Sequence, residues 1–455
     1  MKVNSSIIKL VALFSIPALL TSCASGGLRK AQTEYRSGSI AMAKNSINGL
    51  AAKEKEGARD SELVFVEQGN ILATNGDAVA AKEAFIKGDR SITKHDQSAK
   101  IQLGNEAGAL LVNLNSLPYR TSPSERLMAS TYLATAFLQN NDLTAARSAI
   151  KLTKNRQAEI FAQFQKQIDK EKATLQQAIN SDPKTKIQIE TGKIDNETAK
   201  LQMAADKFTP YKDLSVPYSE AISGVILGFG ANPESARAAE SFTHALSAHP
   251  NAAFLKKAIG ASPSGTTHVF IEDGVSPELG SFRFDLPIYI NGAFTTLSAA
   301  FPTFQPAPMS GALSTLKIGG NPITPDVICD FDRIAASEFK RKLPGTIAKT
   351  MASSTLKAAA GIAGQIAAKQ SGGDYGNSIA SAMAIGSTIY NVASAQADQR
   401  IWSTLPKQVR YACASTPAGG SVEVGGKSIK LPANGSNLVI ARVINGQVFL
   451  RAIAL

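Results

Sequence analysis

The residue types that catalyse reactions or bind metals are few in this chain and do not gather into a site. Its four histidines are His95, His244, His249 and His268. His244 and His249 are five residues apart, so a helix would point them in different directions. No cysteine or carboxylate cluster accompanies a histidine at the spacing of zinc ligands. The sequence also lacks the motifs of a serine nucleophile and of a dinucleotide-binding loop. We therefore expect no enzyme activity, no metal ion and no cofactor.

Three aspartates, Asp326, Asp330 and Asp332, lie close enough in sequence to be considered as a weak calcium site. They lack the glycine and the final glutamate of a calcium-binding loop. Acidic side chains are also common at the start of a helix, where they interact favourably with the helix dipole. The pattern therefore favours a helix N-terminus over a calcium site.

Cys23 is the residue whose chemistry the sequence indicates most clearly. Lys2 and Lys9 precede an apolar run over 10–20, and small residues lead from it into the cysteine. A positive head, a short apolar middle and small residues at a cleavage site are typical of a secretory signal. The run is too short for a permanent membrane span. With its cysteine at the cleavage site, residues 1–22 resemble the signal of bacterial lipoproteins; an ordinary signal peptide with a chance cysteine is the alternative.

The resemblance implies that Cys23 is the lipidation site. In lipoproteins the thiol receives a diacylglycerol, the signal is removed before the cysteine, and the new amine is acylated. Several acyl chains hold a protein to a membrane almost permanently. Residue 24 is alanine rather than aspartate, which by the same resemblance favours the outer membrane and the periplasm, with the cell surface as the alternative. Residues 23–27 are expected to form a flexible tether.

The mature chain is basic. Removing Lys2 and Lys9 lowers the formal net charge from +12 to +10. A basic envelope protein attracts anionic lipid, peptidoglycan or acidic protein partners. The lysines are scattered and not interleaved with aromatic residues, so the sequence does not indicate nucleic-acid binding.

Two further cysteines, Cys329 and Cys413, are candidates for a disulfide, because an even pair in an oxidising compartment is commonly bonded. The alternative is two free thiols in the core, since cysteine is among the most buried residue types.

The spacing of apolar residues over 28–154 predicts helices in pairs. In the clearest unit, Gly69 is expected where two helices approach closely, Gly76-Asp77 forms the turn, and Phe85 lies on the second helix. A similar unit follows over 133–153, and another helical unit is expected within 207–262. Small residues at one contact and large ones a turn later resemble the tetratricopeptide repeat (TPR).

Residues 155–206 are polar and predict two exposed helices that are interrupted at Asp182-Pro183. A solvated spacer and a partner-binding coiled coil are the two interpretations. The lack of a sustained heptad favours the spacer.

The fold class expected for the whole chain is α+β. Two regions, 263–325 and 401–455, contain short β-branched and aromatic runs separated by Gly, Pro and Asn, which predict strands. Asn445-Gly446 is expected to form a tight hairpin turn. Between the two regions, 326–400 predicts a helical hairpin. We expect N-terminal TPR-like repeats followed by one β-sandwich-like module with this hairpin inserted.

The hairpin is dominated by Ala, Gly, Ser and Ile over 345–397. Small residues allow close helix packing. Lys349, Lys357 and Lys369 on the first arm and polar residues on the second make neither arm a strong membrane span. A water-soluble packed hairpin is the favoured interpretation, and a membrane-active or oligomer-forming hairpin is the alternative.

A resemblance to a family rests on residues 397–406, which read Ala-Asp-Gln-Arg-Ile-Trp-Ser-Thr-Leu-Pro between a small-residue helix and a β segment. Together with Cys23, the paired helices, the strand at 267–272 and Phe301-Pro302, this segment resembles a family of uncharacterised bacterial outer-membrane lipoproteins with TPR-like repeats. Genes of that family often lie beside one for a lipoprotein activator of penicillin-binding proteins. The resemblance implies a role in the cell envelope or in peptidoglycan synthesis.

Within that segment Asp398 and Arg400 are expected to make polar contacts at the end of the helix. Trp402, the sole tryptophan, is either a buried structural anchor or an exposed anchor for a partner. The sequence thus predicts a protein-interaction scaffold that is held to a membrane by its lipid and offers the concave face of its helical repeats to envelope proteins.

Overall fold

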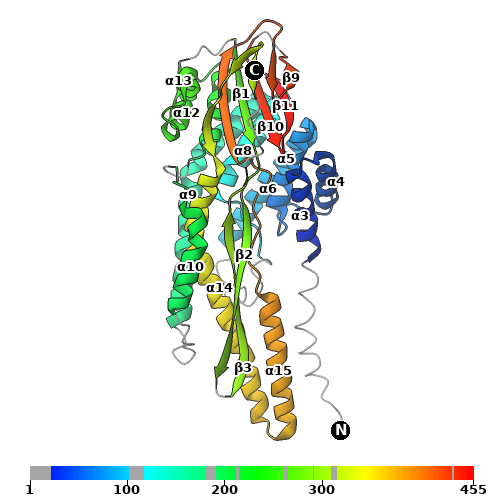
Figure 1. Cartoon of the computed structure of the whole chain (residues 1–455), viewed down its shortest axis with the longest axis vertical. Helices are drawn as coiled ribbons and strands as arrows, with labels where there is room; N and C mark the ends of the chain where they lie inside the picture. Colours follow the sequence, from blue (N-terminus) through cyan, green and yellow to red (C-terminus); the bar gives the residue numbers. More distant parts are fainter. Residues whose placement is uncertain are drawn as a thin grey trace.

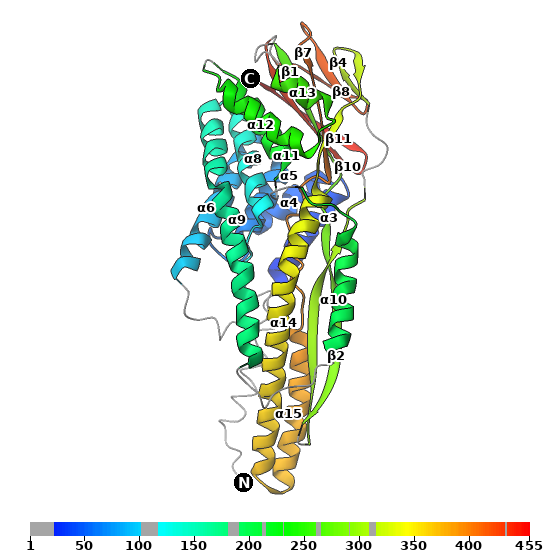
Figure 2. The same cartoon turned by 90° about the vertical axis from the view of Figure 1, so that its left-hand side faces the viewer.

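The computed structural model is an elongated α+β molecule with a wide head and a long stalk (Figures 1 and 2). It describes residues 22–101, 117–180, 191–211, 215–230, 232–260, 265–290, 292–308, 315–432 and 435–455. The apolar run of the signal, the side chain of Cys23 and the break at Asp182-Pro183 lie outside this description.

Helices α3 to α13 form much of the head and one side of the stalk, and α14 and α15 form the stalk hairpin. Their bounds are α3 (Ser22–Arg36), α4 (Ile40–Ala51), α5 (Ser61–Asn75), α6 (Ala78–Ile101), α8 (Pro123–Gln139), α9 (Leu143–Asn180), α10 (Thr191–Asp206), α11 (Pro217–Gly228), α12 (Ser235–Ala248), α13 (Ala253–Ile259), α14 (Phe331–Gln370) and α15 (Gly373–Ser394).

Consecutive helices pack in pairs, as the sequence predicts: α3 with α4, α5 with α6, α8 with α9 and α11 with α12. Gly69 lies directly against the ring of Phe85, so that an ideal Cβ at Gly69 would lie 2.6 Å from the ring. Gly224 lies against Phe242 in the same way, at 2.8 Å. Gly76 ends α5 with a φ of +92°, which glycine adopts without strain. The predicted close approach and turn are therefore confirmed.

The head contains a five-stranded sheet with the order β11-β10-β1-β7-β6. Only β1 and β10 are parallel; the other neighbours in this sheet are antiparallel. Asn445-Gly446 joins β10 to β11 with positive φ at both residues, as predicted. The strands are β1 (Thr266–Asp273), β6 (Asp326–Asp330), β7 (Gln408–Ser415), β10 (Asn437–Ile444) and β11 (Gln447–Ala454).

The two faces of this sheet pack against different layers. One face shares a core with a four-stranded sheet of order β5-β4-β8-β9, through residues such as Val269, Val439 and Val422. The other face packs against the paired helices through Phe270, Tyr411 and neighbouring residues. The smaller strands are β4 (Leu316–Ile318), β5 (Asn321–Ile323), β8 (Ser421–Val424) and β9 (Lys427–Lys430). The regions before and after the stalk hairpin thus share both sheets.

Two long strands, β2 (Glu278–Ile290) and β3 (Ala293–Gln305), form a separate ribbon along the stalk. The prediction that all strands join one sandwich is therefore wrong for these two. β3 packs against α14, α15 and α10. Pro302 is tolerated because a two-stranded ribbon consists only of edge strands.

Polar side chains of the stalk helices hydrogen-bond the backbone of β3. The Gln365 amide accepts from the Phe294 N–H at 3.0 Å and donates to the Phe294 carbonyl at 2.7 Å. Asn391 donates to the Thr296 carbonyl at 2.9 Å. Because an unpaired edge strand invites association with other chains, these side chains protect part of the ribbon's edge.

Three regions differ from the sequence prediction. Residues 23–27, expected to form a flexible tether, are helical and belong to α3, which begins at Ser22. Residues 326–330, expected at the start of the helical hairpin, form β6, so the hairpin begins at Phe331 and ends at Ser394. Residues 155–206, expected to form a solvated spacer, contribute buried side chains: Phe164 and Ile168 on α9 and Leu201 on α10. Helices α9 and α10 both lie against α14 along the stalk (Figure 2).

The contact between Gly69 and Phe85 predicts opposite effects of the same substitution at two helical glycines. Overpacking typically costs about 1–3 kcal/mol, more than the roughly 0.5–1 kcal/mol that alanine gains over glycine in a helix. We expect Gly69→Ala to lower the free energy of unfolding by about 1–2 kcal/mol. Gly49 in α4 has no atom within 4 Å of its ideal Cβ, so Gly49→Ala should raise it by about 0.5–1 kcal/mol. Urea denaturation measures both, and a stabilised Gly69→Ala protein would contradict the close packing.

Candidate functional site

Segment 398–405 runs from the end of α15 towards β7 and crosses the head between the helices and the five-stranded sheet. Trp402 in this segment is fully buried. Its ring meets the ring of Tyr132 edge-on, with 5.8 Å between the centroids, and its Nε1 donates to Thr404 Oγ1 at 2.9 Å. Of the two roles considered for Trp402, this burial favours the structural anchor.

Two buried carboxylates bind the backbone of segment 398–405. Glu125 Oε1 accepts from the Trp402 N–H at 2.9 Å, and Glu67 Oε1 accepts from the Ser403 N–H at 2.7 Å. The Tyr119 hydroxyl donates to both oxygens of Glu125, at 2.7 and 2.8 Å. Burial raises the pKa of Glu67, and it outweighs the hydrogen bonds to Glu67, which lower it. Both carboxylates therefore satisfy backbone donors that have left water.

Side-chain amides of α3 and α5 bind the same segment. Gln32 donates to Glu67 at 2.7 Å and to the Ile401 carbonyl at 3.4 Å. Asn70 donates to the Thr404 carbonyl at 2.8 Å. The helices thus hold segment 398–405 as a receptor holds an extended peptide, with donors and acceptors matched along its backbone.

Arg400 ties the segment to the start of α5. It makes a bidentate pair with Asp398, at 2.9 and 2.7 Å, and its Nη1 donates to Asp60 Oδ1 at 2.7 Å. Burial lowers the pKa of Arg400, but the hydrogen bonds and charges of Asp398 and Asp60 outweigh burial and raise it. These residues were expected to end the stalk helix; α15 instead ends at Ser394, and they connect the extended segment to the helical pairs.

Arg442 on β10 is the centre of a buried hydrogen-bond network that the sequence pattern does not predict. Its Nε donates to the Tyr35 hydroxyl at 3.0 Å, and its two Nη groups donate to the carbonyls of Glu272 at 2.9 Å and Thr404 at 3.2 Å. Tyr218 on α11 donates to Glu272 Oε1 at 2.6 Å. The one signal in the sequence is a charged residue inside the apolar run 438–444.

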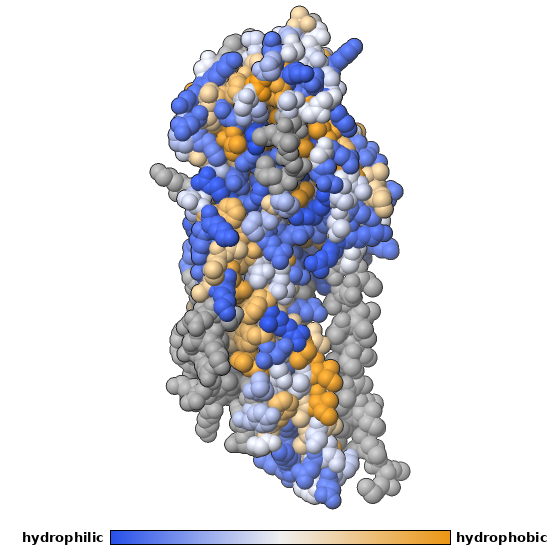
Figure 3. Space-filling model, in the orientation of Figure 1, coloured by the Kyte–Doolittle hydropathy of each residue, from blue (hydrophilic) through white to orange (hydrophobic). Residues whose placement is uncertain are grey.

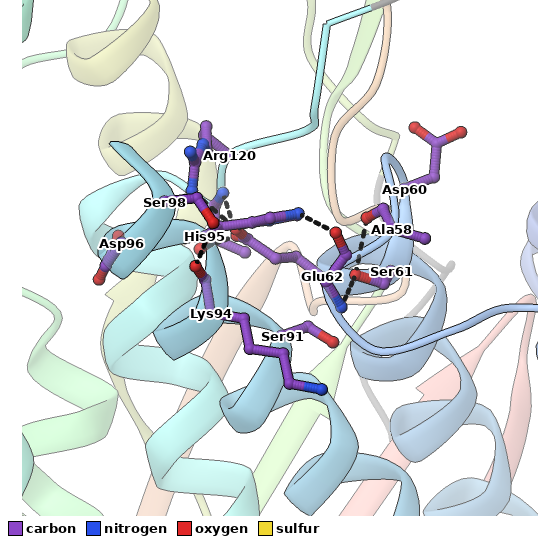
Figure 4. Close-up of polar contacts among 12 residues, drawn as sticks. Ala58, Asp60, Ser61, Glu62, Ser91, Lys94, His95, Asp96, Ser98 and Arg120 are labelled. Atoms are coloured by element: carbon purple, nitrogen blue, oxygen red, sulfur yellow. Dashed lines mark hydrogen bonds and ion pairs between the residues drawn. The ribbon is translucent and has the colours of Figure 1, made fainter. Parts of the chain in front are cut away.

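Glu62 and His95 form a second buried polar cluster, on α5 and α6 (Figure 4). Glu62 Oε1 lies 2.6 Å from His95 Nδ1, and Glu62 Oε2 accepts from the N–H and the hydroxyl of Thr121 at 2.8 and 2.7 Å. His95 Nε2 lies 3.0 Å from the carbonyl of Gly57. Both ring nitrogens therefore face acceptors, and neither is open to a metal ion or a substrate.

The other three histidines have partners too: His268 Nδ1 with the Tyr411 hydroxyl (2.7 Å), His249 Nε2 with the Tyr211 hydroxyl (2.8 Å) and His244 Nδ1 with Glu220 Oε2 (3.9 Å). Burial lowers the pKa of His268 to about 3. Burial, with the charge of Arg333, lowers that of His249 to about 4. The rings of His268 and His249 are therefore neutral near pH 7.

Cys329 and Cys413 are free and buried, so the predicted disulfide is wrong. Cys329 pairs with Val409 across β6 and β7, and Cys413 is four residues further along β7. Four residues of strand extend about 13 Å, whereas the two Cα atoms of a disulfide lie within about 7 Å. Burial raises the pKa of both thiols, which makes them poor nucleophiles.

The three aspartates of the calcium candidate face different partners. Asp326 Oδ2 accepts from the Phe254 N–H at 2.7 Å, Asp330 caps α14 by accepting from the Asp332 N–H at 2.9 Å, and Asp332 pairs with Lys407. Asp330 and Asp332 thus lie at the N-terminus of α14, as the sequence pattern favoured. Within the described ranges, no three His, Cys, Asp or Glu residues are grouped to hold a metal ion.

A cavity of about 280 Å³ lies beside segment 398–405, between α9, α14, β2 and β3. Its lining is largely apolar and includes Phe164, Phe304, Phe339 and Leu343. A largely apolar cavity of this size is a candidate ligand site.

The chain matches no model of a known protein family, and neither the curated proteins nor the solved structures contain a significant match. Among the helices that the structure describes, none combines the length and the apolar character needed to cross a membrane.

The Glu62 carboxylate should make the stability of the fold depend on pH. Burial raises its pKa, but hydrogen bonds from His95 and Thr121 outweigh burial, so that its pKa is lowered. A lowered pKa contributes stability that is present above the pKa of the unfolded chain, about 4.3, and is lost as the pH falls through the folded value. We expect Glu62→Gln to lower the free energy of unfolding by about 3–5 kcal/mol near neutral pH and by less in acid, measured by urea denaturation across this pH range.

Glu67→Gln is the matched control, because Glu67 lies on the same helix and is equally buried but has a raised pKa. A raised pKa contributes stability that is present below the unfolded value and is lost as the pH rises through the folded one. The difference in the free energy of unfolding between the wild-type protein and Glu67→Gln should therefore shift in favour of the wild-type protein as the pH falls. The same sign of pH dependence for both variants would contradict this assignment.

Proposed function

We propose that the chain is a non-enzymatic lipoprotein, anchored through Cys23 to the outer membrane and facing the periplasm, that acts as a protein-interaction scaffold in cell-envelope or peptidoglycan-synthesis machinery. The lipoprotein-like signal supports the anchor. Buried or paired histidines and thiols with raised pKa values fit a role without catalysis.

The arrangement of the helical pairs supports the TPR-like interpretation. The first helix of each pair lies towards the sheet and segment 398–405, through Tyr35 on α3, Asn70 on α5, Tyr132 on α8 and Tyr218 on α11. This is the surface on which the TPR-like interpretation predicts a partner. Because the chain's own segment covers it, the proposal places the partner on another surface.

Helix α15 of the stalk hairpin is the main support for the proposal, because it exposes apolar side chains and has almost no charged residues. Tyr375, Ile385 and Ile389 on α15 are 62–63% exposed, and Leu356 on α14 is 40% exposed. Asp374 is the one charged residue of α15. Figure 3 shows apolar surface on the stalk. Ile385 and Ile389 are four residues apart and therefore share one face of α15, and neighbouring exposed apolar residues mark interaction sites more often than scattered ones do.

The same observation favours a second candidate function, a membrane-active or oligomer-forming envelope protein that uses hairpin 345–397. Small residues along α14 and α15 would let a second copy approach closely. An uncharged helix face is equally suited to lie in the interfacial region of a membrane.

Site-specific photo-crosslinking in cells tests the proposal. A photoreactive residue at Ile389 is compared with one at Val79 on α6, which is 64% exposed but lies in the head. We expect position 389, and not position 79, to form adducts with an envelope protein, and Cys23→Ala to abolish them. Adducts with a second copy or with lipid would support the second candidate instead. Equal adducts at the two positions, or none at either, would contradict both.

A further inference from the structure

The cavity beside segment 398–405 is lined by side chains from several elements that are distant in sequence. Phe164 and Ile168 come from α9, Phe339 and Leu343 from α14, and Phe304 from β3. The volume of about 280 Å³ is near the lower end of the range of ligand pockets, about 300–1,000 Å³. The space therefore suits one slender apolar chain rather than a two-chain lipid.

The acidic groups on the lining are already bonded within the protein. Glu338 accepts from the N–H and the hydroxyl of Ser124, both at 2.8 Å. Glu125 binds Tyr119 and the backbone of segment 398–405, as described above, and Asp398 binds Arg400. Burial raises the pKa of Glu338, and the charge of Lys342 partly opposes this effect. A ligand would therefore meet little free negative charge here.

Arg120 and Lys342 are two cationic groups on the lining of the cavity. Arg120 Nη1 lies 3.8 Å from Glu62 Oε1, whose nearer partner is His95, and it has no hydrogen-bond acceptor within the described part of the chain. The Lys342 ammonium lies 5.5 Å from the centre of the Phe164 ring, which itself lines the cavity. An apolar lining that also carries cationic groups is complementary to an amphiphile with an anionic head.

We propose that this cavity binds a single-chain anionic amphiphile, with its acyl chain among the phenylalanine and leucine side chains and its carboxylate or phosphate against Lys342 and Arg120. Each methylene that enters the apolar part should raise affinity about fourfold until the space is filled. The site is separate from the stalk surface and does not depend on the scaffold role.

Binding is tested on the full chain carrying Cys23→Ser, which has no acyl groups of its own. Displacement of a fluorescent fatty acid is followed with dodecanoate, dodecyl phosphate, dodecanol and dodecyltrimethylammonium. We expect the two anions to bind about tenfold tighter than the alcohol or the cation. A lysophosphatidylglycerol arm distinguishes a membrane lipid from a free fatty acid as the source of the anionic chain. Absence of saturable displacement, or equal affinity for all four head groups, would overturn the proposal.

Variants locate the site. Lys342→Met should lower the affinity for dodecanoate about tenfold and leave the affinity for dodecanol unchanged. Arg341→Met is the control, because Arg341 is exposed and outside the lining; it should change neither affinity. Ala335→Phe, which extends a lining residue, should weaken both ligands. Far-ultraviolet circular dichroism and melting confirm that each variant is folded. Equal effects of Lys342→Met and Arg341→Met, in folded proteins, would contradict the assignment whatever Ala335→Phe does.

Discussion

Backbone N–H groups that leave water must find acceptors, and this requirement governs how the head of the molecule is joined to the rest. The N–H groups of Trp402 and Ser403 enter a dry interior, where Glu125 and Glu67 accept them. Each carboxylate comes from a helix of the paired array. Without these acceptors the segment would carry unpaired donors, each of which costs about 1–3 kcal/mol. Helices, segment and sheet thus form one structure.

The same segment positions the stalk. One end of the stalk hairpin leaves β6 at Phe331, whose N–H donates to the Lys407 carbonyl at 2.7 Å. Lys407 also pairs with Asp332 in the first turn of α14. The other end of the hairpin continues into segment 398–405. Because both ends are fixed in the head, the exposed face of α15 is presented in a defined position, as an interaction surface or a membrane contact requires.

Local patterns in the sequence predicted the elements that depend on neighbouring residues. Gly69 and Phe85 indicated a close helix pair, and Asn445-Gly446 indicated the turn between β10 and β11. Both predictions depend only on residues that are near one another in the sequence. The partners across long separations were less accessible. The alternating pattern of β2 and β3 is the same whether a ribbon packs on helices or joins a sheet, so its separate position was missed.

The buried charges were missed for a related reason. Arg442 is one charged residue in an apolar strand, and its acceptors come from α3, β1 and segment 398–405. The disulfide prediction failed because a count of two cysteines contains no information on the distance between them: Cys329 on β6 pairs with Val409, four residues from Cys413 on β7. The segment around Trp402 was recognised as distinctive, but the burial that explains it depends on Glu67 and Glu125, more than 270 residues away along the chain.

Hydrogen exchange of the Trp402 and Ser403 amides tests the central claim most directly. If buried carboxylates hold this segment between helices and sheet, these amides exchange only when the whole head unfolds, as slowly as the amide of Phe270 in the core strand β1. Exchange as fast as that of the exposed turn at Asn445-Gly446 would show that the segment is not part of the core, and would contradict the account.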